Sequence, residues 1–193
     1  MDKHSDPIQL PIRKTTHLQR GRTSTQGAKY FITINTKNRK SGLCQKRLAE
    51  TLIQVLRGQH SRGDFEMIAG TIMPEHIHLL IRLGSRLTLS ATIGKFKSQT
   101  KQILADSLLV WQKNFFDHKL RADHISEGFA KYIFLNPYRR GLLTSKEIWP
   151  WWFCNKNYRP EFFALLLDGQ YPHPKWIEED VDLESLFGSD KED

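Results

Sequence analysis

The chain alternates short apolar runs with polar segments, and the period of each run predicts an element of secondary structure. Apolar side chains recur at every second position over residues 28–36, which is typical of a strand. Over residues 45–59 the spacing changes to three and four residues, which predicts a helix. Two runs rich in Ile and Leu, 65–73 and 76–83, follow with only a short Met-Pro-Glu connection and predict a β-hairpin.

The second half of the pattern predicts one more strand and two more helices. Residues 87–109 show the spacing of a long helix, 110–120 are assigned to a fourth strand, and 123–135 form a helix with Asp123 as its N-cap. This helix is expected to end before Asn136-Pro137, because a residue that precedes proline is pushed out of helical geometry. The order predicts an α+β fold: a ferredoxin-like βαββαβ sandwich with helices on one face of an antiparallel sheet, plus an additional C-terminal helix.

The domain organisation follows from changes in composition along the chain. Residues 1–27 contain Pro, Gly, Ser and Thr with scattered Arg and Lys and are interpreted as a flexible basic arm. Residues 28–145 hold the predicted elements. Residues 146–174 are rich in aromatic side chains and are expected to pack on this core as an extension, and 175–193 form an acidic tail.

Composition excludes several classes of protein. None of the apolar runs approaches the roughly 18 residues that a membrane span needs, and the first ten residues lack the apolar segment of a secretory signal. The two cysteines, Cys44 and Cys154, lie far apart and indicate neither a disulfide framework nor a thiolate zinc site. We therefore expect a reduced cytoplasmic protein that does not bind a membrane.

The formal net charge of +8 on 193 residues is unevenly distributed. Residues 175–193 carry eight acidic and two basic side chains, so the preceding part holds 27 basic against 13 acidic side chains, a net charge of +14. Such an excess points to a polyanionic partner, of which nucleic acid is the commonest, although basic proteins also occur without one. The acidic tail is interpreted as a solubilising terminus or, more specifically, as a nucleic-acid mimic that lies on the basic surface until DNA displaces it.

Two histidines stand one residue apart in the strand predicted over 76–83. Because side chains alternate between the faces of a strand, His76 and His78 project together while Ile77 points to the other face. Such a pair is a common beginning of a metal site, but it is also compatible with two ordinary surface or core histidines.

A third ligand is sought in the last predicted helix. Tyr132 and Asn136 are four residues apart and therefore share one helical face. Taken singly, Tyr132 is equally well explained as a core tyrosine and Asn136 as a C-cap residue.

Together these motifs resemble a known family. The His-Ile-His motif, followed by Tyr132-Ile-Phe-Leu-Asn-Pro-Tyr-Arg-Arg-Gly-Leu142, is similar to the single-tyrosine HUH transposases, and within them to the REP-associated tyrosine transposases of bacteria. The segment Gly21-Arg-Thr-Ser-Thr-Gln-Gly27 and the positions of Trp111 and Phe116-Asp-His118 fit the same pattern. The resemblance covers about residues 21–152. Tyr138 departs from it, since a small aliphatic residue is more usual there, and places a second phenol near the motif.

The resemblance implies a metal-dependent single-stranded DNA endonuclease and strand transferase that acts on hairpin DNA through a 5′-phosphotyrosine intermediate. It implies Tyr132 as the nucleophile, with His76, His78 and Asn136 as ligands of Mg²⁺ or Mn²⁺. A monomer is favoured over a homodimer, and the protein would be associated with the bacterial nucleoid. The residues expected to contact DNA are Arg13, Lys14, Arg20, Arg22, Thr23, Ser24, Lys95, Lys97, Lys101, Arg139 and Arg140.

Two other functions remain open on the sequence. One is a noncatalytic regulatory protein of the same fold that binds hairpin DNA. The other is a metal-dependent phosphodiesterase that uses water in place of a tyrosine and so forms no covalent adduct.

Overall fold

A computed structural model describes residues 24–121, 126–179 and 186–187 of the chain. Several predicted features lie outside these residues. They are the N-cap Asp123 and the candidate DNA contacts Arg13, Lys14, Arg20, Arg22 and Thr23.

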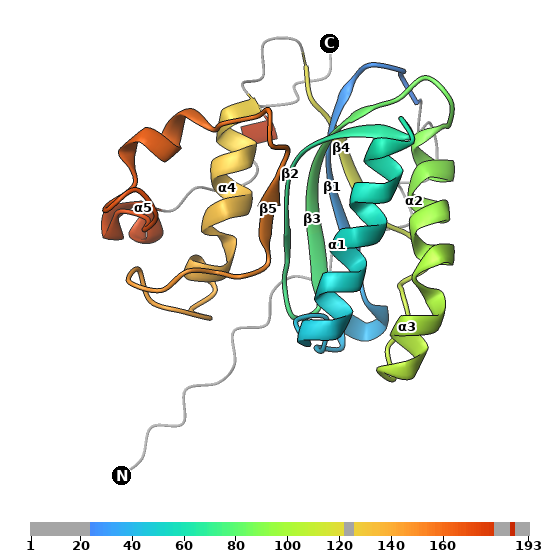
Figure 1. The fold of residues 1–193 in the computed structure, drawn as a ribbon, viewed down its shortest axis with the longest axis horizontal. Helices are drawn as coiled ribbons and strands as arrows, with labels where there is room; N and C mark the ends of the chain where they lie inside the picture. The colour runs from blue at the N-terminus through green and yellow to red at the C-terminus, as the bar shows by residue number, and fades with distance from the viewer. Residues whose placement is uncertain (1–23, 122–125, 180–185, 188–193) are drawn as a thin grey trace.

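The described residues form one β-sheet, whose strands differ in length, with a layer of helices on each of its faces (Figure 1). The elements in chain order are β1 (Lys29–Asn35), η2 (Lys37–Arg39), α1 (Lys46–Ser61), β2 (Phe65–Ile72), β3 (His76–Leu83), α2 (Leu89–Gln99), α3 (Lys101–Asp106), β4 (Phe116–Lys119), α4 (Ser126–Arg139), β5 (Trp152–Cys154), η3 (Glu161–Leu165) and α5 (Pro174–Glu178). None of the helices in this part of the chain has the length and apolar content needed to cross a bilayer.

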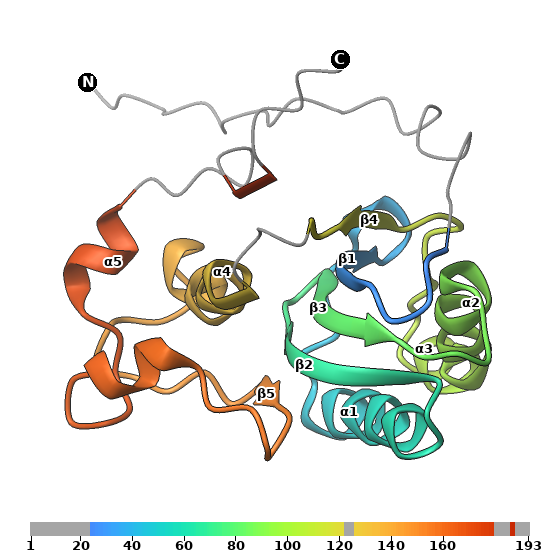
Figure 2. The same ribbon diagram turned by 90° about the horizontal axis from the view of Figure 1, so that it is seen from above.

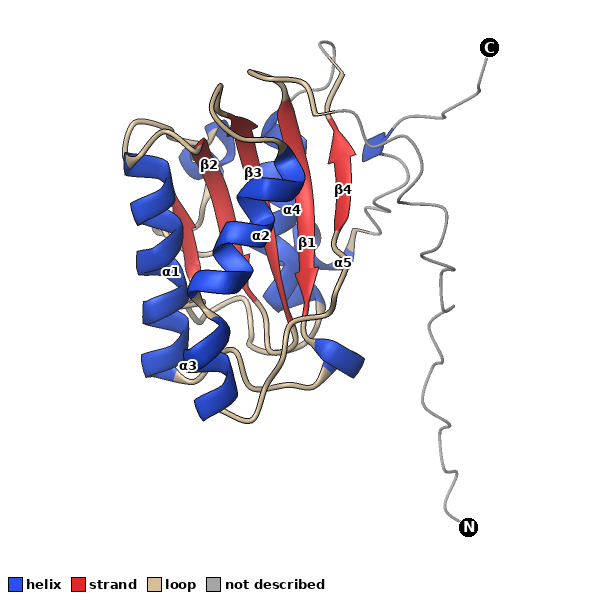
Figure 3. Cartoon of the chain, turned by 90° about the vertical axis from the view of Figure 1, so that its right-hand side faces the viewer, coloured by secondary structure: helices blue, strands red, loops and turns tan. Residues whose placement is uncertain are grey.

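The sheet is antiparallel throughout, with the strand order β4-β1-β3-β2-β5 (Figure 3). The first four strands have the ferredoxin-like arrangement, so the predicted fold class is confirmed. β5 is an additional strand that the sequence analysis missed. It pairs with β2 where Gly70 lies opposite Phe153, and a Cβ atom at residue 70 would meet that ring at 2.6 Å. Glycine is therefore required for the extension to approach the sheet this closely.

Each face of the sheet has its own apolar core. α1 and α2 cover one face, where Ile32, Ile34, Ile77 and Leu79 are fully buried. α4 covers the opposite face and packs on Phe31 and Leu80 (Figure 2). The helices of the βαββαβ unit, α1 and α2, share one face as predicted, and the additional helix α4 lies on the other face because the chain crosses the sheet after β4.

The long helix predicted over residues 87–109 is two helices, α2 and α3, which meet at Thr100. The Thr100 hydroxyl donates to the carbonyl of Phe96 at 2.8 Å and accepts the indole N–H of Trp111 at 2.9 Å. A threonine that bonds back to the preceding turn bends a helix, and the contact with the partly buried Trp111 fixes the bend.

The predicted fourth strand over residues 110–120 is also shorter than expected. Within this range only the residues of β4 pair with β1 as a strand, and Trp111 makes an isolated bridge to Thr36. The intervening backbone is held by the ammonium group of Lys97, which donates to the carbonyls of residues 112, 113 and 114 at 2.8, 3.2 and 3.0 Å. Carbonyls that bind a side chain in this way are not available to a β ladder.

Helix α4 continues through Pro137 instead of ending at residue 135. Proline fixes φ near the helical value, so its cost lies in the lost N–H and the contact with the preceding turn. Here Asn136, Pro137 and Tyr138 are all buried against the sheet and its extension, and the Tyr138 hydroxyl donates to the carbonyl of Glu147 at 2.9 Å. Packing of this last turn therefore outweighs the local preference before proline.

Candidate active site and metal centre

The pairing of β1 with β3 places four polar side chains on the face of the sheet that α4 covers. Thr33 lies opposite His78 and Asn35 lies opposite His76, while Ile77 points into the other core. His76 and His78 are only 3% and 4% exposed. The predicted projection of the two imidazoles from one strand face is therefore observed, but they lie in the interior of the protein and not on its surface.

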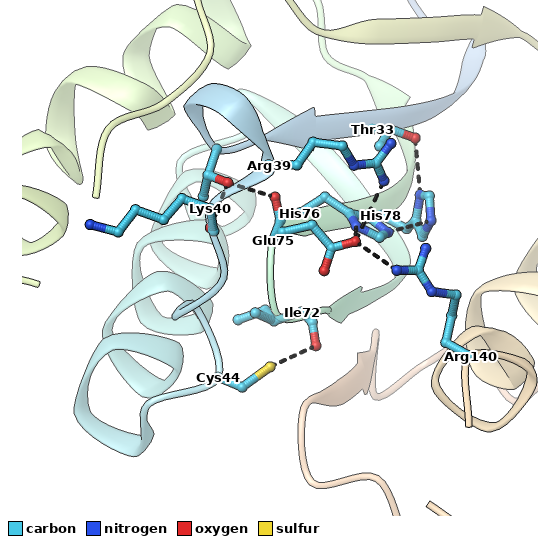
Figure 4. Close-up of polar contacts among 10 residues, drawn as sticks. Thr33, Arg39, Lys40, Cys44, Ile72, Glu75, His76, His78 and Arg140 are labelled. Carbon is cyan, nitrogen blue, oxygen red and sulfur yellow. Dashed lines mark hydrogen bonds and ion pairs between the residues drawn. The ribbon is translucent and has the colours of Figure 1, made fainter. Parts of the chain in front are cut away.

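The two imidazoles converge on a single point. Their Nε2 atoms are 2.9 Å apart, while Nδ1 of His76 lies 3.2 Å from Oε1 of Glu75 and Nδ1 of His78 lies 3.0 Å from Oγ1 of Thr33 (Figure 4). Because the carboxylate of Glu75 only accepts, His76 carries its proton on Nδ1 and presents a lone pair at Nε2. The hydroxyl of Thr33 can accept in the same way from His78. A carboxylate or hydroxyl behind a ligating imidazole is the usual support of a metal-binding histidine.

Both imidazoles are neutral in the folded protein. Burial lowers the pKa of His76, against the opposing hydrogen bond and charge of Glu75. Burial also lowers the pKa of His78 well below 6.5, and the neighbouring His76 and the positive charges of Arg39 and Arg140 lower it further. A metal ion binds only the neutral form of imidazole. Burial disfavours protonation of both histidines and therefore favours metal binding.

Helix α4 adds a phenol and an amide to the histidine pair. The ring of Tyr132 lies 5.7 Å from that of His78, and Asn136 is one helical turn further along. Oδ1 of Asn136 is buried and receives no hydrogen bond from the described residues. The predicted grouping of these four residues is thus found around one cavity of about 270 Å³.

The donor set fits a divalent cation. Two imidazole nitrogens and the amide oxygen of Asn136 face the same cavity. Oδ1 of Asn35, which also lines it, likewise has no hydrogen-bond partner among the residues that the structure describes. Among the described residues no group of three or more His, Cys, Asp and Glu side chains is placed to hold a metal ion, and the amide oxygen of Asn136 is the candidate for the third protein ligand at this site. By ligand softness, two imidazoles with an amide oxygen suit Mn²⁺, Zn²⁺ and other transition-metal ions, whereas the expectation of Mg²⁺ or Mn²⁺ comes from the family resemblance.

A cluster of one acid and two guanidinium groups borders the same cavity. Nη2 of Arg140 lies 3.1 Å and Nη2 of Arg39 lies 3.5 Å from Oε1 of Glu75 (Figure 4). Burial would raise the pKa of Glu75, but His76, Arg140 and Arg39 together lower it to about 2. Glu75 therefore stays ionised and holds the guanidinium groups of Arg39 and Arg140 at the edge of the cavity. Two guanidinium groups in this arrangement suit a phosphate.

Sequence reasoning missed Glu75, Arg39 and the two residues of β1, Thr33 and Asn35. Glu75 directly precedes the histidine strand and was assigned only to a connection. Arg39 reaches the site from a turn in which Asn38 and Arg39 both have left-handed backbone angles, with φ of 56° and 52°. Backbone of this kind in residues other than glycine is often found at functional sites, but it leaves no sequence signal.

The second phenol of the motif lies elsewhere. Tyr138 is buried, does not line the cavity and uses its hydroxyl to bind the carbonyl of Glu147. Burial raises its pKa, and the charge of Glu147 adds to this. Of the two tyrosines of α4, Tyr132 is the one that the structure brings to the histidines.

The structure separates the predicted DNA contacts into different groups. Arg140 borders the site, whereas Arg139 donates to the carbonyl of Trp176 at 2.8 and 3.3 Å. Lys95, Lys97 and Lys101 lie on α2 and α3, across the sheet from the histidines. These lysines are therefore not part of the site.

Three more of the predicted contacts have structural partners. Lys95 binds Asp64 at 2.6 Å and Lys97 binds backbone carbonyls. The hydroxyl of Ser24 accepts from the backbone N–H of Leu89 at 2.9 Å, at the start of α2. Contacts within the chain therefore already occupy part of the surface that these side chains form.

Comparison with known proteins gives consistent matches. The family described as "Transposase IS200 like" matches residues 24–133. A REP-associated tyrosine transposase of Escherichia coli (strain K12) is 27% identical over 134 residues, which cover 65% of this chain and 75% of the relative. A putative REP-associated tyrosine transposase of Haemophilus influenzae is 25% identical over 156 residues, with 74% and 88% covered. A solved REP-associated tyrosine transposase bound to a REP hairpin superimposes with a TM-score of 0.60 at 24% identity, covering 84% of this chain and 91% of that one.

The fold and these matches define the protein as a transposase. The family match covers more than half of the residues, including both histidines and Tyr132. The chain belongs to the IS200-like transposase family, and its resemblance to the REP-associated tyrosine transposases is confirmed by the relatives above.

Proposed function

We propose that this protein is a metal-dependent endonuclease and strand transferase for single-stranded or hairpin DNA, with Tyr132 as its nucleophile. One observation carries the proposal: the phenol of Tyr132 shares a cavity with two convergent imidazole nitrogens and with the amide oxygen of Asn136 that lacks a partner. Hairpin DNA is chosen as the substrate class because the relatives are REP-associated and a protein of the same fold has been solved with a REP hairpin.

His76, His78 and Asn136 are the proposed ligands of Mg²⁺ or Mn²⁺. When bound there, the cation would polarise the scissile phosphate and offset charge that develops in the displacement. Arg39 and Arg140 would bind non-bridging phosphate oxygens from the other side of the cavity, with Glu75 keeping both guanidinium groups in place.

The phenolic oxygen of Tyr132 attacks the phosphorus in line with the departing 3′ oxygen. A tyrosine O–P bond forms and the P–O3′ bond breaks, while the phenol loses one proton and the 3′ oxygen gains one. The product is a 5′-phosphotyrosine and a free 3′-hydroxyl. Because the phosphodiester energy is retained in the covalent bond, attack by a 3′-hydroxyl reverses the step and transfers a strand.

The test uses hairpin oligonucleotides that carry a label at one end or the other, with Mn²⁺, on a denaturing gel. A label at the 3′ end should move with the protein as a covalent adduct, while a label at the 5′ end should appear on a free, shorter fragment. Tyr132→Phe should abolish the adduct, and Tyr138→Phe should retain it.

Each other outcome of this gel points to a different function. An adduct that persists in Tyr132→Phe and disappears in Tyr138→Phe would identify Tyr138 as the nucleophile and would refute the proposal. Cleavage without adduct would indicate a phosphodiesterase that uses water, and binding without cleavage would indicate a regulatory protein.

We infer that the protein acts as a monomer. One chain is able to supply all side chains of the proposed site, and the Arg140–Glu75 ion pair joins the residue after α4 to the residue before β3. A homodimer that exchanges α4 would form the same pair between its two chains, so the mass in solution distinguishes the two states. Light scattering of the purified protein at working concentration should give one chain, about 22.6 kDa.

A further inference from the structure

The end of β1 brings a second amide to the histidine pair. Asn35 is the last residue of β1 and lies opposite His76, the first residue of β3. Its neighbour Ile34 is buried in the core on the other face of the sheet, so alternation along the strand places the Asn35 side chain on the face of the histidines. Asn35 lines the same cavity as the two histidines and Asn136. Two amides, one from the sheet and one from α4, therefore border the histidine pair.

The amide oxygen of Asn35 is buried and has no hydrogen-bond partner among the described residues. Buried polar atoms in proteins are nearly always hydrogen-bonded, because an unpaired one loses its contact with water and gains nothing in return. The backbone does not account for the side chain, since the carbonyl of Asn35 already accepts from the N–H of Gln112 at 2.9 Å. Asparagine is also uncommon in strands. The oxygen therefore faces the cavity with a free lone pair for a group from outside this part of the chain.

The groups around Asn35 indicate what kind of partner its oxygen takes. Arg39 and Arg140 bind the carboxylate of Glu75. The Nδ1 atoms of the two imidazoles face Glu75 and Thr33, so both rings turn their Nε2 lone pairs to the cavity (Figure 4). Two nitrogen lone pairs and two amide oxygens thus meet with no proton between them to share. A cation is the one partner that satisfies all four atoms together.

We propose that Asn35 is a fourth protein ligand of the divalent cation, through Oδ1, beside His76, His78 and Asn136. This rests on the proposed function, which supplies the cation. The set joins β1, β3 and α4, and all of its members are uncharged. Four protein ligands leave about two positions of an octahedral ion for water or phosphate oxygens. Phosphate of the DNA then provides the negative charge that the protein ligands lack.

The test measures binding of Mn²⁺ to the full-length protein without DNA, from the electron paramagnetic resonance signal of the free ion. Asn35→Leu keeps a side chain of similar size and removes the oxygen. It should weaken Mn²⁺ binding by at least about 10-fold, because loss of an outer-shell partner alone costs roughly 10- to 100-fold. Asn35→Ala, which adds no bulk, should give the same result. Asn35→Asp keeps an oxygen in place and should bind Mn²⁺ at least as tightly as the wild type.

A second readout separates ligation from a general effect of charge or folding. Water-proton relaxation gives the number of water molecules on bound Mn²⁺, which should be about two in the wild type and in Asn35→Asp and about three in Asn35→Leu. Asn155 is the matched control, because its Oδ1 accepts from the N–H of Asn157 at 3.0 Å and it does not line the cavity. Asn155→Leu and Asn155→Asp should change neither the affinity nor the number of water molecules.

The outcomes separate this ligand from the proposed function. Unchanged Mn²⁺ affinity and water number in Asn35→Leu and Asn35→Ala would overturn the ligand and leave the proposed function standing. Weaker hairpin binding with unchanged Mn²⁺ binding would overturn it as well, because the amide would then contact DNA. Weaker Mn²⁺ binding by Asn35→Asp would also overturn it, since a ligating position accepts a carboxylate. A wild type that binds no Mn²⁺ would overturn the metal dependence of the proposed function together with the ligand.

Discussion

The buried histidine pair makes the stability of the protein depend on pH in a direction that can be calculated. His78 is neutral in the folded state because burial lowers its pKa well below 6.5, whereas in the unfolded chain it titrates near that value. Below about pH 6.5, His78 therefore binds a proton in the unfolded state and does not bind one in the folded state. The contribution of His78 to stability is complete above this pH and is lost as the pH falls toward the folded pKa.

The size of the effect follows from the same linkage. Between about pH 7.5 and 5.5, a histidine that stays neutral in the folded state lowers the free energy of unfolding by about 1.4 kcal/mol. His76, whose pKa is also lowered by burial, adds up to the same amount again. Glu75, with a pKa of about 2, stays ionised over this range and does not oppose the trend.

The measurement is urea unfolding of the wild type and of His78→Gln in EDTA at several pH values in this interval. The wild type should lose about 1.4 kcal/mol more than the variant between the two ends, since the variant has no imidazole at residue 78. The free energies at one pH do not matter for this comparison, because only the difference in slope is used. Equal slopes would show that His78 takes up protons equally in the folded and unfolded states, and would refute the lowered pKa of the buried imidazole.

Three more predictions concern single residues. Tyr138→Phe removes one hydrogen bond and should lower the free energy of unfolding by about 1 kcal/mol in urea, while adduct formation by Tyr132 continues on the denaturing gel. Gly70→Ala should cost about 1–3 kcal/mol, because its Cβ would meet the ring of Phe153 at 2.6 Å; an unchanged urea midpoint would contradict the packing of β5 on β2. Glu75→Gln should weaken Mn²⁺ binding by roughly 10- to 100-fold in calorimetry, as loss of a carboxylate behind a ligating histidine does, and an unaltered affinity would remove Glu75 from the site.

Much of the frame could be predicted from local periodicity. The alternation of residues 76–83 placed His76 and His78 on one face, and the spacing of Tyr132 and Asn136 placed them on one helical stripe. Both inferences need only the geometry of a single element. That the two pairs meet depends on α4 crossing to the other face of the sheet, which no local pattern shows.

The errors arose where a tertiary contact overrides a local preference. Thr100 breaks a helix that its neighbours favour because its hydroxyl also binds Trp111. Pro137 stays inside α4 because the residues around it are buried. The strand β5 is only three residues long and is defined by the β2 edge that it pairs with, so its sequence alone gave no reason to expect it.

The DNA surface was predicted mainly from the positions of basic side chains, and this is where sequence reasoning was least able to discriminate. Lys95 and Lys97 count as positive charges in any composition, yet one neutralises the buried Asp64 and the other caps three carbonyls. Arg39 had no distinguishing signal, although it borders the site. A basic side chain becomes a candidate for phosphate binding only when the structure shows which other groups it contacts.

The ion pair between Arg140 and Glu75 has a consequence for genetics. It joins the residue after α4 to the residue before β3, and in the proposed monomer each copy of the protein carries the complete set of proposed site residues. A cell that expresses His78→Gln and Tyr132→Phe from separate genes should therefore regain no activity, since neither product can complete the other. Inactive alleles should behave as recessive, and activity should follow the number of intact gene copies.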